Sequence, residues 1–388
     1  MDMAALRIGV IGTGFVARHF VHELMRREGY RLGKVLTRRP LASCGEFPVR
    51  EALTDSVDAL IGSSDIVLEC TGDVLWATET IGKVMAAGRP VVTLNPEFHV
   101  TTGSFFVPMG LLSEAEGDQP GCQASLLEEV RELGFKPLVL GNIKGFLNRH
   151  PTPEDMRYWA ERQGISLAMV TSFTDGTKLQ VEQALVANGL GFDIARDELL
   201  GPATDDLKEA GRLLGEAATS LGRPVADYVL SGKLPHGVFV TGTHHGEQKE
   251  ALRYLKMGDG PYYTVLRPNI FVHLEVFRTL ERVARTRTPL LNNGALPTIG
   301  VAAVAKRALK PGELIERGCG SFEMRGICVR IAERPGHLPI GLAEQVRIRR
   351  RIEPGQVISM ADIELPPSQA LDCWKTIERS VVAMPRAA

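Results

Sequence analysis

The chain opens with a glycine-rich turn set between an apolar run and an amphipathic segment. Residues 7–17 read Arg-Ile-Gly-Val-Ile-Gly-Thr-Gly-Phe-Val-Ala. Gly12 permits a tight turn out of a strand, Gly14 lets the backbone approach a pyrophosphate, and the small Ala17 lets the following helix pack closely. The first turn of that helix offers unpaired N–H groups and the positive end of its dipole. We therefore predict a dinucleotide site rather than an ordinary glycine-rich turn. Its candidate residues are Gly12, Thr13, Gly14, Phe15, Val16 and Ala17.

The end of the second apolar run, residues 32–36, indicates which dinucleotide binds. An NAD-selective site has an acidic residue near this position, roughly 20 residues past the glycines. Here Thr37, Arg38 and Arg39 follow the run, and none of them is acidic. A hydroxyl can hydrogen-bond a 2′-phosphate, and a guanidinium can hold it with two N–H groups. We expect NADP(H); the alternative is that both arginines are solvated loop charges.

Composition narrows the class of protein. With 388 residues, 44% hydrophobic and 23% charged, the chain is long enough for two or three domains with substantial cores. The net charge of −1 excludes a general field for nucleic acid or anionic membranes, and neither is expected as a partner. No apolar run approaches the roughly 20 residues of a membrane span, and the amino terminus enters a strand rather than a signal peptide, so the expected compartment is the cytoplasm. The six cysteines form no Cys-x-x-Cys pair, which argues against a structural zinc site.

Strand and helix patterns alternate through the first third of the chain. Residues 65–72 and 90–94 read as buried parallel strands, with a helical segment at 75–87 between them. The pattern predicts an α/β fold with a doubly wound parallel sheet of the Rossmann type. Thr71, Gly72 and Asn95 fall where strands end, at the edge where such sheets bind ligands, and are further cofactor candidates. A helix near 125–133 and a strand at 137–141 close this domain, which we place at residues 1–141.

Residues 142–303 read as an α+β substrate domain. A strand-like run at 167–173 precedes a helical run at 179–188. Two further runs, 254–257 and 262–266, flank a Gly-Asp-Gly-Pro turn and resemble a hairpin, and a long amphipathic helix spans 270–285. Because these elements do not alternate strictly, we expect an α+β unit that covers the cofactor.

The carboxyl-terminal region contains an internal repeat. Leu-Lys-Pro-Gly-Glu-Leu-Ile at 309–315 returns as Ile-Glu-Pro-Gly-Gln-Val-Ile at 352–358. Each Pro-Gly turn precedes a short β-like run, so the pattern predicts a small appended β unit with pseudo-symmetric halves at residues 304–366. Residues 367–388 are then a carboxyl-terminal tail.

Several of these segments resemble known families. The glycine turn, residues 65–72 and residues 91–95 resemble the nucleotide domain of the homoserine dehydrogenase superfamily. The repeat is similar to SAF domains, which are β-clip modules. Together with residues 117–120, 141–145, 173–178 and 255–261, the chain resembles the deoxyxylulose-phosphate reductoisomerase-like family over residues 7–366. The run Thr37-Arg38-Arg39 departs from that family, in which an acidic residue is often found at this place.

The resemblance implies an α-ketol rearrangement of a phosphorylated ketose followed by hydride delivery from NADPH. Such chemistry needs a cation to hold two oxygens, a general base and donors for a phosphate. The candidates for the reacting centre are Lys144, Asp175, Lys178 and Glu182. Those for an anionic or orienting contact are Arg149, His150 and Asn188. Glu97 and Asp175 are the candidates for holding Mg²⁺ or Mn²⁺.

Other interpretations remain open at this point. Lys178 and Glu182 lie four residues apart and could be a helix-surface ion pair. The function could be that of a plain NAD(P)-dependent dehydrogenase of the homoserine kind, without carbon migration. It could also be that of a non-catalytic NADP- or carbohydrate-binding protein. For the enzyme we expect a small polar keto or hydroxy substrate, for example a sugar phosphate, and a homo-oligomer.

Overall fold

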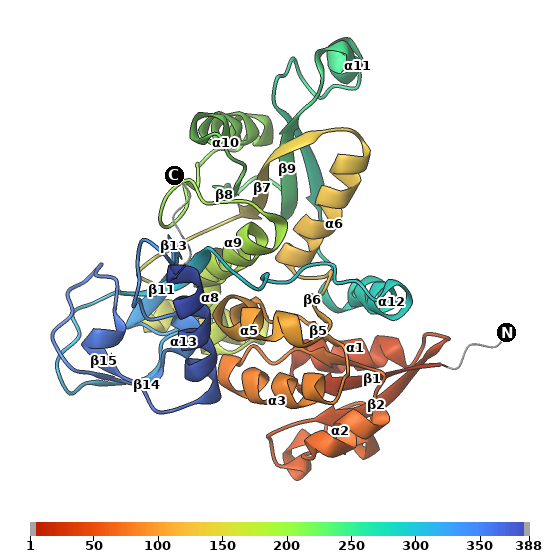
Figure 1. Ribbon diagram of the computed structural model, residues 1–388, viewed down its shortest axis with the longest axis vertical. Coiled ribbons are helices and arrows are strands. Elements are labelled where there is room, and N and C mark those ends of the chain that lie inside the picture. The colour runs from red at the N-terminus through yellow and green to blue at the C-terminus, as the bar shows by residue number, and fades with distance from the viewer. Residues whose placement is uncertain (1–4, 384–388) are drawn as a thin grey trace.

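A computed structural model describes residues 5–383, and its amino-terminal part is built on a six-stranded parallel sheet (Figure 1). The strand order is β3-β2-β1-β4-β5-β6, so the order reverses between β1 and β4. The strands are β1 (Leu6–Ile11), β2 (Tyr30–Leu36), β3 (Leu53–Thr54), β4 (Ile66–Glu69), β5 (Val91–Thr93) and β6 (Leu112–Glu114). The helices between them are α1 (Phe15–Leu24), α2 (Val57–Ser63) and α3 (Val74–Ala86). This confirms the expected doubly wound α/β sheet, whose switch point is the usual place for a ligand.

A helix from much later in the chain completes this first core. Helix α12 (Val276–Thr286) buries Val276, Leu280 and Val283, which share one face. Its Phe277 stacks on Phe20 of α1 with ring centroids 4.9 Å apart. The helix begins at Val276 rather than near residue 270, because residues 272–274 form a 3₁₀ turn. Part of the expected substrate domain therefore packs on the nucleotide domain, as the position of α12 beside α1 in Figure 1 shows.

The second sheet has the order β10-β9-β7-β8 and is mixed. Its strands are β7 (Lys136–Lys144), β8 (Val225–Leu230), β9 (Gly237–Thr243) and β10 (Tyr263–Pro268). Along β7, Leu140 joins the core with α6 (Gln119–Glu132) and α9 (Thr177–Leu190), whereas Val139 joins the core with α10 (Leu207–Leu221). This alternation shows that helices cover both faces of the sheet. The boundary expected at residue 141 falls inside β7, which belongs to this second sheet, and α6 packs against the same sheet.

Two segments of the second domain differ from their sequence patterns. Residues 167–173 form helix α8 (Leu167–Thr174), not a strand, and pack beside α7 (Pro153–Gln163). Ser166 caps α8, because its hydroxyl accepts the Met169 N–H at 3.2 Å, and this cap outweighs the β-branched residues that suggested a strand. Of the expected hairpin only β10 forms, since α11 (Lys249–Tyr254) ends at the first residue of the other expected strand and residues 255–257 form a turn.

The internal repeat is confirmed by backbone pairing in the carboxyl-terminal β unit. Leu309 and Ile352, the first residues of the two copies, exchange hydrogen bonds of 3.0 and 3.1 Å. The Gly312 N–H donates to Ile348 O, and Gly355, which is 43 positions later, donates to Ala305 O; both distances are 2.8 Å. Positions 305 and 348 are themselves 43 apart, so the two halves are related by a pseudo-twofold. The strands are β11 (Ile299–Ala305), β12 (Leu314–Arg317), β13 (Met324–Arg330), β14 (Glu344–Ile348) and β15 (Ile363–Glu364).

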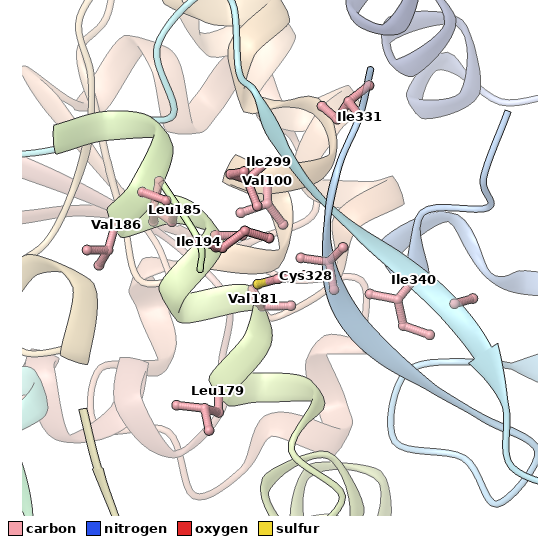
Figure 2. Close-up of a cluster of buried hydrophobic side chains, with 14 of the residues drawn as sticks. Val100, Leu179, Val181, Leu185, Val186, Ile194, Ile299, Cys328, Ile331 and Ile340 are labelled. Carbon is pink, nitrogen blue, oxygen red and sulfur yellow. The ribbon is translucent and has the colours of Figure 1, made fainter. Parts of the chain in front are cut away.

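This β unit is packed into the molecule rather than appended to it. Strands β11 and β13 lie against α9, where Val181 and Cys328 belong to one buried cluster (Figure 2). Each fully buried aliphatic side chain of such a cluster contributes about 1.5–3 kcal/mol relative to exposure. Helix α13 (Gln369–Val382), expected as a tail, buries Trp374 and packs against α3. Residues 384–388 of that expected tail lie outside the described residues.

Residues 5–383 contain neither a membrane-spanning helix nor a disulfide bond. Among residues 5–383, no helix combines the length and apolar character needed to cross a bilayer. The six cysteines, all within that range, are free thiols.

Candidate functional site

The glycine turn after β1 has the backbone shape that its sequence predicts. Gly12 has φ +118°, and a Cβ there would lie 3.3 Å from the Cys70 carbonyl oxygen. Gly14 has nothing within 4 Å of the place where a Cβ would stand, and no side chain caps α1 at this residue. The N–H groups of the first turn of α1 therefore face open space beside bare backbone. This arrangement fits a dinucleotide pyrophosphate.

The end of β2 forms a small polar pocket lined by Thr37, Arg38, Arg39 and Trp76. The guanidinium of Arg38 stacks on the Trp76 ring, 4.6 Å from its centroid, and pairs with Asp73. The Thr37 hydroxyl accepts the Arg39 N–H at 3.1 Å. The two arginines and the threonine thus converge at the place where the ribose next to the adenine would lie in a Rossmann sheet.

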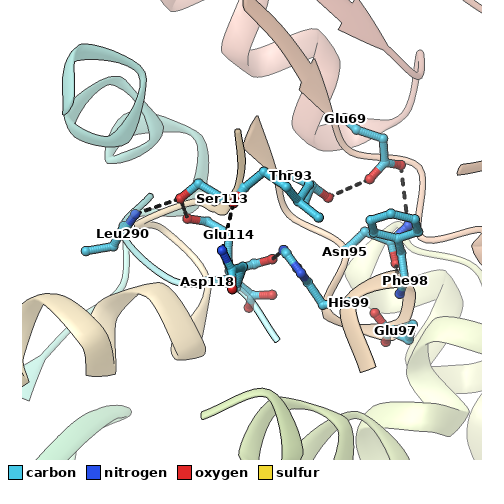
Figure 3. A network of polar contacts seen from close by, with 12 residues as sticks. Glu69, Thr93, Asn95, Glu97, Phe98, His99, Ser113, Glu114, Asp118 and Leu290 are labelled. Carbon is cyan, nitrogen blue, oxygen red and sulfur yellow. Dashed lines mark hydrogen bonds and ion pairs between the residues drawn. The ribbon is translucent and has the colours of Figure 1, made fainter. Parts of the chain in front are cut away.

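The ends of β4 and β5 are held by a buried carboxylate. Glu69 accepts hydrogen bonds from the Thr71 N–H at 2.7 Å and the Thr93 hydroxyl at 2.6 Å (Figure 3). Burial raises the pKa of Glu69, and these hydrogen bonds oppose the rise. Asn95 is completely buried and caps α4 (Pro96–Phe98) by accepting the Phe98 N–H at 3.0 Å. Asn95 therefore shapes the loop from inside, whereas Thr71 and Gly72 line the adjacent cavity.

A cavity of about 240 Å³ begins at this edge of the nucleotide domain. Thr71 and Glu97 line it from the segments that follow β4 and β5. Phe173 lines it from α8, and Lys178 lines it from α9. The carboxyl-terminal β unit supplies a further wall with Arg317, Cys319, Ile340, Gly341, Ala343 and Glu344. All three parts of the fold therefore meet at the switch point of the sheet.

Lys178 is the charged centre of this cavity. Its ammonium lies 3.1 Å from Glu97 Oε2 and 3.6 Å from Asp118 Oδ2. Burial alone would lower the pKa of Lys178, but Glu97, Asp118 and Glu182 outweigh it and raise the pKa above its ordinary value. Lys178 is consequently an ammonium at neutral pH. Sequence reasoning did not single out Asp118; its signal was the Gly117-Asp118-Gln119-Pro120 run, which caps α6.

Glu182 interacts electrostatically with both Lys178 and Lys144. Glu182 Oε2 accepts a hydrogen bond of 2.7 Å from Asn142 Nδ2, which comes from β7. Burial raises the pKa of Glu182 to about 7, and the charge of Lys144 opposes this rise. Lys144 lies at the end of β7, with its ammonium 5.9 Å from the centroid of the Phe173 ring. Because the Lys178 side chain is only 13% exposed, Glu182 is buried, and the partners of Lys178 are Glu97 and Asp118, the surface ion pair considered from their spacing is wrong.

The fold places the Asp175 carboxylate beside Lys306 rather than beside Lys178. Its Oδ2 lies 2.6 Å from the Lys306 ammonium, and its Oδ1 accepts the Thr177 N–H at 2.8 Å. The side chains of Asp175 and Lys306 are 0% and 3% exposed. The two carboxylates expected to share a metal, Glu97 and Asp175, are thus each held by a different lysine. Among residues 5–383 no three His, Cys, Asp or Glu side chains are grouped to hold a metal ion, and this donor set does not fit one.

Of the candidates for the reacting centre, only Lys178 lines the cavity, and the remaining three candidates, Arg149, His150 and Asn188, do not line it either. Arg149 pairs with Glu198 at 2.8 Å, and His150 is exposed. Asn188 donates to Ile299 O at 2.8 Å and accepts the Ile299 N–H at 2.9 Å, so it pins β11 to α9. These geometries give Arg149 and Asn188 structural contacts.

A buried acid and base lie near Lys178 that the sequence pattern did not reveal. His99, in a π-helical turn after α4, places Nε2 3.4 Å from Glu114 Oε2, and neither side chain is exposed (Figure 3). Burial lowers the pKa of His99 to about 3 and raises the pKa of Glu114 well above its ordinary value. His99 is therefore neutral at pH 7, and burial favours the neutral, protonated form of Glu114.

Part of the chain that contains this site is similar to a known family of oxidoreductases. Residues 117–276 match the family model for the catalytic domain of oxidoreductase DRL, a range that includes Asp118, Lys144, Lys178 and Glu182. No curated protein matches the chain. Residues 117–276 are thus similar to an oxidoreductase catalytic domain and follow a sheet of the Rossmann type. The match does not extend to the narrower homoserine dehydrogenase, reductoisomerase or SAF resemblances.

Solved structures similar to this chain include several dehydrogenases and related proteins. UDP-N-acetylglucosamine 3-dehydrogenase GnnA from Acidithiobacillus ferrooxidans has 15% identity and a TM-score of 0.45, with coverage of 75% of this chain and 93% of its own. An oxidoreductase from Thermotoga maritima has 15% identity and a TM-score of 0.40, with coverage of 74% and 91%. An NAD-binding protein from Listeria innocua has 12% identity and a TM-score of 0.38, with coverage of 74% and 89%.

Proposed function

We propose that the chain is an NADP(H)-dependent oxidoreductase that reduces a carbonyl to an alcohol on a small polar substrate, with Lys178 as the proton donor. The observation that carries the proposal is the buried ammonium of Lys178, held by Glu97 and Asp118 in a cavity that also contains Thr71 and Gly72 from the cofactor edge. The preference for NADP(H) rests on Arg38 and Arg39 at the end of β2.

The chemistry divides between the cofactor and the chain. When bound, the reduced nicotinamide supplies a hydride to the carbonyl carbon. Lys178 donates a proton from Nζ to the carbonyl oxygen, so that one hydride and one proton convert the carbonyl to an alcohol. The neighbouring carboxylates favour the ammonium form, which positions Lys178 as a donor before the reaction. Glu182, four residues later on α9 and with a pKa of about 7, is suited to return a proton to Lys178 afterwards.

Of the two finer activities considered from sequence, a reduction without carbon migration fits this site better. The rearrangement was expected to use a divalent metal on Glu97 and Asp175. Those carboxylates are instead engaged by Lys178 and Lys306. The two activities differ in their products, because only the rearrangement alters the carbon skeleton of a carbon-13-labelled ketose phosphate, as read by NMR.

The test compares Lys178→Met with wild type and with Lys83→Met, an exposed lysine on α3. NADPH affinity is measured by fluorescence titration, and turnover is measured over a panel of ketose phosphates, aldehydes and hydroxy acids. We expect Lys178→Met to bind NADPH as wild type does and to lose at least about 100-fold in turnover, the usual scale of a lost acid-base group. Lys83→Met should match wild type in both measurements. Full turnover in Lys178→Met would contradict the assignment.

A further inference from the structure

A short segment of the carboxyl-terminal β unit reaches the cavity beside Lys178. Arg317, the last residue of β12, and Cys319 both line the cavity. Gly320 has φ +73°, and a Cβ there would lie 2.0 Å from the Ala168 carbonyl oxygen of α8. A Cβ on Gly318 would lie 2.4 Å from the Ala343 Cβ. Only glycines at these positions let the segment approach α8 and hold Arg317 at the cavity wall.

Arg317 differs from the other cation of the cavity in having free donors. Among the residues that the structure describes, its guanidinium forms no hydrogen bond within the protein, and its nearest acidic atom is Glu344 Oε1, 3.7 Å from Nε. The side chain is 54% exposed. By contrast, the charge of Lys178 is already taken by Glu97 and Asp118. Of the two cations that line the cavity, Arg317 is therefore the one whose charge is less compensated by the protein.

The acidic side chains near Arg317 do not prevent an anion from binding its guanidinium. Glu97 also lines the cavity, but its carboxylate is engaged by Lys178. Glu344 is the remaining acidic neighbour of Arg317, and burial raises its pKa while Arg317 opposes the rise. An anion that binds Arg317 thus has to displace only a loose ion pair. A guanidinium favours planar, two-point contact with carboxylate or phosphate oxygens.

We propose that Arg317 forms an anion subsite that holds a carboxylate or phosphate group of the substrate while the reacting carbon lies near Lys178. This inference rests on the proposed function, and it names the substrate class as an anionic keto or hydroxy compound. It also gives the carboxyl-terminal β unit a direct part in substrate selection.

The test measures binding of inorganic phosphate, malonate and neutral glycerol by isothermal titration calorimetry, with and without saturating NADPH. The full-length proteins are wild type, Arg317→Met and Arg347→Met. Arg347 is the matched control because it is exposed on β14 of the same unit and does not line the cavity. We expect wild type and Arg347→Met to bind at least one anion and not glycerol. Arg317→Met should lose at least about 10-fold in anion affinity, the size of one charge-assisted contact. The stronger of the two anions identifies the group as phosphate or carboxylate.

Three outcomes would overturn the subsite. They are no anion binding by wild type at millimolar concentrations, equal anion affinity in Arg317→Met, and an equal loss of NADPH affinity in Arg317→Met, which would assign Arg317 to the cofactor. A urea unfolding curve for each variant confirms that the comparison is between folded proteins. If wild type binds phosphate through Arg317 but does not bind NADPH, the proposed function fails and the subsite stands.

Discussion

The buried ion pair between Asp175 and Lys306 is tested by removing its cation. Lys306→Met keeps most of the apolar volume and leaves the Asp175 carboxylate without the ammonium that lies 2.6 Å from it. Both side chains are almost fully buried, so solvent cannot replace the lost partner. Removing one partner of such a pair costs about 3–5 kcal/mol in the free energy of unfolding. With a urea m-value of about 3 kcal/mol/M, the unfolding midpoint falls by about 1–1.7 M.

The pH dependence and a double variant separate this explanation from simple loss of packing. Burial raises the pKa of Asp175 and Lys306 opposes that rise, so in Lys306→Met the carboxylate is protonated more readily in the folded state. The destabilisation should therefore be larger at pH 8 than at pH 5. Asp175→Asn combined with Lys306→Met removes the unpaired charge and should recover most of the loss, whereas Lys310→Met, exposed in the same unit, should change nothing. A double variant no more stable than Lys306→Met would refute the reasoning.

Two further predictions concern the cofactor pocket and the buried acid on α9. Replacing Arg38 and Arg39 by alanine should weaken NADPH binding at least about 10-fold and leave NADH binding within about 2-fold, because only NADPH carries the 2′-phosphate. Fluorescence titrations with both cofactors measure this, and an equal loss for NADPH and NADH would contradict the pocket assignment. For Glu182, burial raises the folded-state pKa to about 7. Between about pH 4.5 and 7 the folded protein therefore holds a proton on Glu182 that the unfolded chain has lost. The free energy of unfolding then falls by up to about 3 kcal/mol as pH rises through that window. Glu182→Gln should remove this part of the decline between pH 5 and pH 8 in urea unfolding, and an unchanged decline would argue against a raised pKa.

The parts of the fold that the sequence predicts well are set by local patterns. The glycine turn needs a positive φ at Gly12 and open space at Gly14, and both requirements are visible in residue type alone. The repeat predicts its own pairing, because equivalent backbone positions of the two copies exchange the same hydrogen bonds. Helix α8 was misread because its β-branched residues favour a strand, while the decisive contact is a single serine cap.

The charge environment of the site depends on residues far apart in the chain and was only partly predictable. Lys178 and Glu182 could be expected together from their spacing, but the carboxylate of Asp118 arrives from another helix and Arg317 from another domain. Nothing near Asp175 in the sequence indicates that Lys306 will neutralise it. An isolated buried charge costs too much free energy to persist, so a buried acidic residue needs a partner. That partner can lie far away in the sequence, and it decides whether the residue takes part in the reaction or stabilises the fold.

The start of α9 is where the stability of the fold and the chemistry of the site depend on the same residues. Asp175 accepts the Thr177 N–H with one oxygen and binds Lys306 of the β unit with the other. Lys178, the next residue after Thr177, then points its ammonium at Glu97 and Asp118. The carboxylate that the sequence suggested as catalytic is thus placed to fix the first turn of α9 against the β unit, and through that turn the position of Lys178. If Lys178 donates the proton as proposed, we expect Asp175 to act as a positioning residue, because it links the β unit that carries Arg317 to the first turn of α9.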